Sequence, residues 1–198
     1  MIHWSHHIEK TCTKIRQHLR VISRISGNID QLTAQTLVKA MVFPLFDYGD
    51  VTWSTCSISL QNRLQRLQNR AGKMVLKCPF RTLTTEVQRR LKWAPLKDIQ
   101  NYHKVQMVQK CLCKLVPPYL WDTFTATGNI YRGTTTRAAQ TNCLYIPNAN
   151  NNSAQKMFKY RGACAWNALT PDLRSSNSDN FKAQFWSQYW NHAESQIQ

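Results

Sequence analysis

The two acidic residues that lie closest together in the sequence, Asp47 and Asp50, are the first candidates for catalysis. Nucleotidyl transfer requires several carboxylates that together hold two metal ions. Residues three positions apart can share one face of a helix, but no third acidic residue lies near this pair. A turn residue and a helix cap explain the two aspartates more simply, so we predict no catalytic residue and no metal site here.

Cysteine spacing does not predict a metal site either. The sequence has seven cysteines, and only one residue separates the closest two, Cys111 and Cys113. Zinc ligands are usually separated by two to four residues. The odd number, the irregular spacing and the apolar helical positions of several cysteines favour packed free thiols in a reducing compartment.

The sequence also lacks the patterns of secretion, membrane insertion and phosphate-loop binding. Polar residues follow Met1 at once, which is not how a signal peptide begins. The longest apolar run, Met41–Phe46, is too short to cross a bilayer. No glycine-rich phosphate loop is present. We therefore expect an intracellular protein of the nucleus or cytoplasm that is not secreted, does not enter a membrane and needs no cofactor.

Charge is the most unusual property of the composition. The chain has 26 Lys and Arg against 10 Asp and Glu, for a net charge of +16. Residues 1–120 contain 19 basic and 6 acidic residues, whereas residues 121–198 contain only 7 and 4. Such a surplus favours a polyanionic partner, although solubility alone is the simpler alternative.

A regular amphipathic helix is predicted from Ser59 to Lys77. Apolar residues recur there at alternating steps of four and three, which is typical of a packed seam, and they are Leu60, Leu64, Leu67, Ala71, Met74 and Cys78. Five cations follow the same spacing beside the seam, namely Arg63, Arg66, Arg70, Lys73 and Lys77. The segment contains no acidic residue, so it predicts a basic rod about 28 Å long.

A second basic helix is predicted near the start of the chain, with Ser5 as its cap and Gly27 as its left-handed end. Its apolar stripe consists of Ile8, Cys12, Ile15, Leu19 and Ile22. Basic residues lie off this stripe, and our candidate contacts among them are Lys10, Lys14, Arg20 and Arg24. Because Lys and Arg neutralise phosphates without reading sequence, both helices are candidate nucleic-acid contacts.

The remaining elements complete a mostly α-helical chain. Asp30 can cap a helix that Pro44 should kink, and Pro95 can begin another that ends before Pro117-Pro118. Residues 1–116 are then a thumb-like helical bundle, and residues 117–198 are a smaller, irregular module with a Thr/Asn-rich loop region. In that module we expect a short strand at Cys143–Ile146, a helix over Ala154–Leu169 and a last helix after Ser178.

Several blocks in the sequence resemble, in their order, the C-terminal region of non-LTR (LINE-type) retrotransposon reverse transcriptases. The matching blocks are Ile2–Ile8, Pro44–Trp53 with its Tyr-Gly and Trp, Leu64–Ala71 with the pattern Leu-Gln-x-x-Gln-Asn-Arg-Ala, Trp93–Leu96, Thr136-Arg137, Phe158, Gly162, Trp166–Pro171 and Phe181-Lys182. Each block alone is weak, but together they cover nearly the whole chain. One departure is Thr170, which stands where the family usually has a proline.

This resemblance implies a non-catalytic part of an RNA-directed DNA polymerase. In the family, the polymerase aspartates lie upstream in the palm, which this sequence lacks. The thumb helices of the family hold the template–primer, so the implied partners are an RNA or RNA/DNA duplex and the missing palm and fingers. The main alternative is a helical protein-interaction module that docks on a palm domain and has an incidental basic surface. A free-standing enzyme has no residue constellation to support it.

Overall fold

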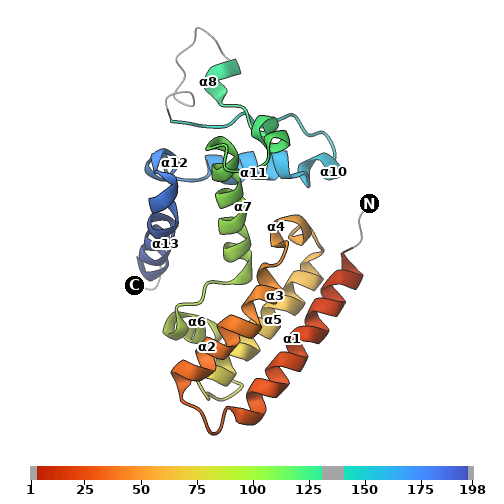
Figure 1. The fold of residues 1–198 in the computed structure, drawn as a ribbon, viewed down its shortest axis with the longest axis vertical. Helices are drawn as coiled ribbons and strands as arrows, with labels where there is room; N and C mark the ends of the chain where they lie inside the picture. Colours follow the sequence, from red (N-terminus) through yellow and green to blue (C-terminus); the bar gives the residue numbers. More distant parts are fainter. Residues whose placement is uncertain (1–3, 131–140, 196–198) are drawn as a thin grey trace. The chain divides into compact units, whose positions relative to one another are not determined.

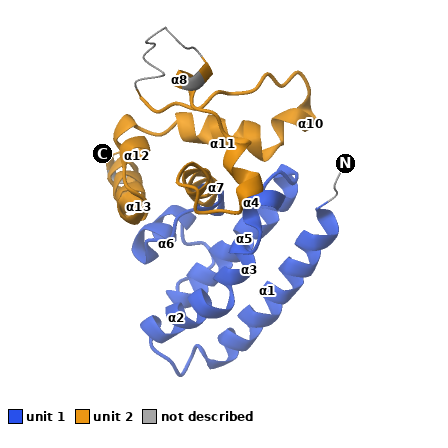
Figure 2. Cartoon of the chain, turned by 45° about the horizontal axis from the view of Figure 1, so that its top comes forward, with its two compact units in different colours: residues 1–100 blue, residues 101–198 orange. Residues whose placement is uncertain are grey.

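The protein is mostly α-helical, as the sequence predicts. The structure is a computed structural model that describes residues 4–130 and 141–195. The chain divides into two compact units, residues 1–100 and residues 101–198 (Figure 2). The sequence predicts a boundary at residue 116. The division falls earlier because Val105, Val108 and Cys111 belong to the buried core of the second unit.

The first unit contains six helices among its described residues, and the connecting helix α7 begins in it (Figure 1). The six are α1 (Ser5–Ile25), α2 (Gln31–Met41), α3 (Phe43–Asp47), α4 (Asp50–Trp53), α5 (Ile58–Val75) and α6 (Thr84–Leu91), and α7 spans Leu96–Leu112.

The apolar stripes predicted for the first unit form its core. The α1 stripe is buried, and Leu64, Leu67 and Ala71 of α5 are buried with it. Gly72 allows α6 to approach α5 closely, since a Cβ there would lie 2.7 Å from Cγ1 of Val87. These contacts hold α1, α5 and α6 together, with the polar sides of α1 and α5 outside.

Helix ends in the first unit follow the sequence only in part. Asp30 caps α2 as predicted, because its carboxylate accepts hydrogen bonds from the backbone N–H groups of Leu32 (3.0 Å) and Thr33 (3.3 Å). Two expectations were wrong. Trp4 occupies the N-cap of α1, so Ser5 is already helical. Gly27 does not adopt a positive φ, because α1 ends at Ile25 in a turn closed by a hydrogen bond from Asn28.

Lysines take the place of glycine at the ends of three helices. Lys77, Lys92 and Lys114 follow α5, α6 and α7 with φ values of 49°, 51° and 56°. In each case the next N–H donates to a carbonyl five residues back, at 3.2, 3.0 and 2.8 Å. This pattern satisfies terminal carbonyls, although the left-handed conformation is costly for a residue with a Cβ.

The second unit consists of short helices and loops around the rest of α7. Its other helices are the 3₁₀ helix η1 (Pro118–Thr123), α8 (Thr127–Ile130), α10 (Asn152–Gln155), α11 (Phe158–Asn167), α12 (Pro171–Ser175) and α13 (Ser178–Ser195). The predicted helix over residues 154–169 is divided between α10 and α11. The predicted strand at residues 143–146 was wrong, because the described residues there form only an isolated bridge between Ala126 and Leu144.

Trp166 is central to the core of the second unit, as the sequence predicts. Its side chain is buried, its ring stacks on Phe181, and its indole N–H donates to the Asn142 carbonyl at 3.0 Å. The neighbouring Asn167 side chain bonds both the N–H and the C=O of Leu144, each at 2.8 Å. The Thr136-Arg137 block lies outside the described residues.

Candidate nucleic-acid interface

The candidate interface lies in the first unit, where α1 and α5 pack against each other and run in the same direction (Figure 1). Near the start of both helices, Glu9 of α1 forms an ion pair with Arg63 of α5, at 3.3 Å. Beyond the end of α1, Ser26 lines the same hollow as Lys73 and Lys77. The first cation of the α5 stripe therefore lies near the start of α1, and the last two lie near its end.

The five predicted cations of α5 are not equivalent in the structure. Arg66 and Arg70 are exposed, whereas Arg63 is half-buried and already held by Glu9. The ammonium of Lys73 donates to the Phe80 carbonyl at 2.5 Å, and that of Lys77 donates to the Ile29 carbonyl at 3.1 Å. Sequence spacing alone predicts one uniform stripe of cations. In the structure, two of the five are exposed, and the other three are bonded to Glu9 or to main-chain carbonyls.

The four predicted cations of α1 are all exposed, but they point in two directions. At about 100° per residue, Arg20 lies within about 20° of Glu9 around the helix axis and Arg24 within about 60°. By the same geometry, Lys10 is turned about 100° and Lys14 about 140° away from Glu9. Arg20 is therefore the nearest of the four to Glu9 around the helix axis, and Arg24 is the next nearest.

Arg16 is a further cation on this side that the prediction did not include. It is half-buried and lies seven residues after Glu9, which places it on the same side of α1. The seven-residue spacing could have indicated Arg16 as a contact residue, but only with the knowledge that Glu9 pairs with Arg63 of α5. We use the name basic face for the surface formed by Arg16, Arg20, Arg24, Arg63, Arg66, Arg70, Lys73 and Lys77.

The basic face has one acidic neighbour within its own helices. Glu9 is the only acidic residue in α1, and α5 has none. Two cations of the basic face also lie near the Cys12 thiol. Burial raises the pKa of the Cys12 thiol, and the nearby charges of Arg63 and Arg16 oppose that rise. A surface with this excess of cations attracts polyanions and binds them more weakly as salt increases.

Glutamines of α5 fix the helix to the segment that precedes α7. The buried Gln68 side chain donates to the Ala94 carbonyl at 2.9 Å and accepts from Gln65 Nε2 at 2.6 Å. Gln65 in turn accepts from the Leu96 N–H at 2.9 Å and donates to Asn69 Oδ1 at 2.8 Å. These residues belong to the Leu64–Ala71 block of the sequence. They hold the apolar side of α5 in place, so its cations face outward.

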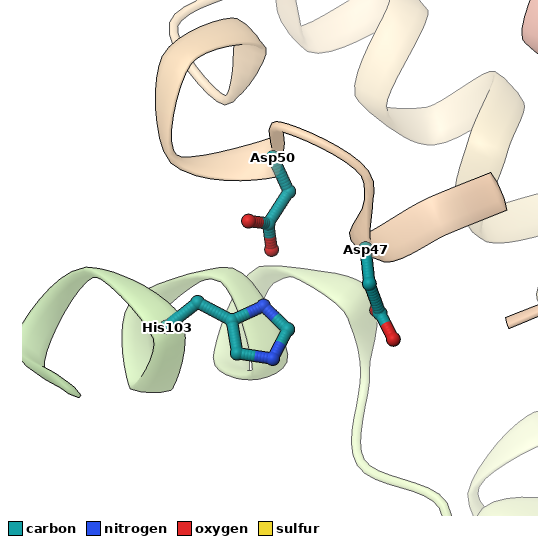
Figure 3. Close-up of side chains that lie close together, drawn as sticks. All are labelled: Asp47, Asp50 and His103. Carbon is teal, nitrogen blue, oxygen red and sulfur yellow. The ribbon is translucent and has the colours of Figure 1, made fainter. Parts of the chain in front are cut away.

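Asp47 and Asp50 belong to different short helices and do not share a helix face. Asp47 ends α3 and Asp50 begins α4 (Figure 3). Between them Tyr48 is extended and Gly49 is left-handed, with a φ of 63°, so the helix is broken. Figure 3 also draws His103, which belongs to α7 in the second unit.

The cysteines are free thiols, as the sequence predicts. Cys12, Cys56 and Cys111 are buried within the two cores, whereas Cys113 is exposed. The exposed position of Cys113 reflects its location beyond the last residue of α7. The pair Cys111 and Cys113 is therefore divided between core and surface.

Two further observations bear on the class of protein. Within residues 4–130 and 141–195, no helix combines the length and the apolar character needed to cross a bilayer. No family model, curated protein or solved structure matches the chain.

Proposed function

We propose that the chain is the thumb and C-terminal part of a non-LTR retrotransposon reverse transcriptase. In this role, the basic face grips an RNA or RNA/DNA duplex without reading its sequence. The carboxylates that catalyse polymerisation belong to the palm, which is the second partner of this chain.

One observation carries the proposal: α1 and α5 pack against each other and, with Lys77 just beyond α5, supply the eight cations of the basic face, while Glu9 is the only acidic residue of the two helices. Arg63 and Lys73 are ten residues apart, which is about 15 Å along α5, and Lys77 follows just beyond the end of the helix. That length is enough to face several phosphates of one duplex. Arginine is well suited to this role, because its planar guanidinium can donate two parallel hydrogen bonds to a phosphate.

The fold supports the proposal through rigidity. The seam and the Gln65–Gln68 network fix α5 against the core, so its cations are held in place before a ligand binds. A preorganised surface loses less side-chain and loop freedom on binding than a flexible tail does.

The test is the salt dependence of binding to a labelled RNA/DNA hybrid, followed by fluorescence anisotropy. If the α5 cations meet phosphates, the slope of log affinity against log salt is roughly −4, at about −0.9 per neutralised phosphate. Replacing both Arg66 and Arg70 with Gln should make the slope less steep by about two units and weaken all sequences alike.

A matched control removes the same charge elsewhere in the first unit. Arg89 and Arg90 of α6 are exposed and lie close to Glu86, at 3.0 and 3.9 Å. Replacing both with Gln changes the net charge equally but should leave the slope near that of the parent chain. If the two double variants behave alike, the basic face is not the binding surface. Salt-insensitive binding to a recombinant palm domain, without hybrid binding, would favour the protein-interaction alternative.

A further inference from the structure

A hollow lies at the end of α5, where the basic face meets an exposed aromatic ring. It is open to solvent and measures about 390 Å³. Its lining includes Arg70, Lys73, Lys77, Ser26 and Phe80. No acidic residue lines it. Met74 and Cys78 complete the lining, and the Ser26 hydroxyl already donates to the Ser23 carbonyl at 2.8 Å. The three cations around one opening are suited to an anionic group such as a phosphate.

The two lysines of the hollow are fixed by main-chain carbonyls but keep donors for a ligand. Lys73 donates to the Phe80 carbonyl, and Lys77 donates to the Ile29 carbonyl. An ammonium has three N–H donors, so neither lysine is saturated by one such bond. The left-handed backbone at Lys77, with a φ of 49°, ends α5 and turns the chain toward Phe80. The charges are therefore held at this position by the end of the helix.

Phe80 is the most exposed of the large apolar side chains in the described residues, with 89% of its surface accessible. The Lys73 ammonium lies 5.0 Å from the centre of its ring, so a cation–π contact and a hydrogen bond hold the same residue. A ring with that exposure still offers a face to solvent. Bases stack on such rings largely irrespective of their sequence, whereas a bare phosphate makes no use of them.

We propose that this hollow binds an unpaired nucleotide of the gripped nucleic acid, with its phosphate among Arg70, Lys73 and Lys77 and its base against Phe80. The inference rests on the proposed function and specifies it, because Arg70, Lys73 and Lys77 also belong to the basic face. A duplex that continues into a single strand would then occupy both the basic face and the hollow. The shared ligand chemistry is a nucleoside phosphate, which a strand or a free nucleotide could supply.

The test compares a blunt RNA/DNA hybrid with the same hybrid carrying a short single-stranded overhang. For the parent chain, the overhang should strengthen binding by about tenfold, the scale of one stacked base. Phe80→Ala should abolish this gain and leave blunt-hybrid binding unchanged, and Phe80→Tyr should retain it. Leu83→Ala is the matched control, because Leu83 is a neighbouring exposed apolar residue that does not line the hollow. It should behave like the parent chain.

The outcomes separate this inference from the proposed function. Salt-dependent hybrid binding without an overhang gain, or a gain that survives Phe80→Ala, would overturn the inference and leave the proposed function intact. No binding of either hybrid would overturn both. Adenosine monophosphate is the free-nucleotide probe, and it should not displace the overhang at concentrations near the affinity of the hybrid. Displacement at such concentrations would show a free-nucleotide site and overturn the assignment to a strand. Circular dichroism checks that each variant is folded.

Discussion

Replacing Gln68 with Leu should destabilise the first unit, even though the two side chains have similar volume. Gln68 is 2% exposed, and its side chain bonds both the Ala94 carbonyl and Gln65. Leucine fills the same space, so no large cavity forms. The substitution removes one side of each hydrogen bond and leaves the backbone carbonyl of Ala94 in place, without its donor.

The expected cost follows from what remains unpaired. A buried acceptor without a partner costs about 1–3 kcal/mol, and each neutral hydrogen bond contributes about 1 kcal/mol net. Gln65 keeps a second acceptor in Asn69, at 2.8 Å, so its amide is not left without a partner. The greater apolar character of leucine offsets part of the loss. We therefore expect the free energy of unfolding to fall by about 2–3 kcal/mol.

Urea unfolding followed by circular dichroism measures this change. Amide hydrogen exchange at Leu96 tests its local origin, since the Leu96 N–H donates to Gln65. Gln17→Leu is the control, because Gln17 is exposed on α1 and the same substitution there should change stability by less than about 0.5 kcal/mol. If Gln68→Leu proved as stable as the parent chain, the network would not anchor α5, and our account of how α5 is held would be refuted.

Three other variants test separate parts of the structure. Trp166→Ala should cost about 3–5 kcal/mol in urea unfolding, as large-to-small changes in a core do, and an unchanged midpoint would show that Trp166 is not a core residue. Lys92→Gly should raise stability by about 1 kcal/mol, because glycine adopts the left-handed conformation freely, and a loss would contradict the assigned backbone. Hydrogen bonds from Thr33 hold the pKa of Asp30 below its ordinary value. The stabilising effect of Asp30 is therefore present above the ordinary carboxyl pKa and is lost as the pH falls through the lowered folded-state pKa. Asp30→Asn caps the helix without titrating, so melting temperatures measured against pH should diverge from the parent chain only in acid.

The sequence alone determined the helical character and the buried sides of the main helices. Hydrophobic spacing is a local property, and Ile8, Ile15, Leu64 and Ala71 are buried where it placed them. The cap at Asp30 was equally predictable, because the hydrogen bonds of a cap join residues two and three positions apart. The expected left-handed end at Gly27 failed, because α1 ends two residues earlier in a turn closed by the Asn28 N–H.

Only the tertiary structure decided which cations act together. Arg63 and Glu9 are 54 positions apart, so no local pattern predicts that they pair. Lys10 and Arg20 look alike in the sequence, but Arg20 lies within about 20° of Glu9 around the axis of α1, whereas Lys10 is turned about 100° away. Phe80 was not predicted as a site residue, because its place in the hollow depends on its contacts with Lys73 and on how the chain turns after α5. Periodicity determines which side of a helix is polar, whereas packing of distant segments determines what that side meets.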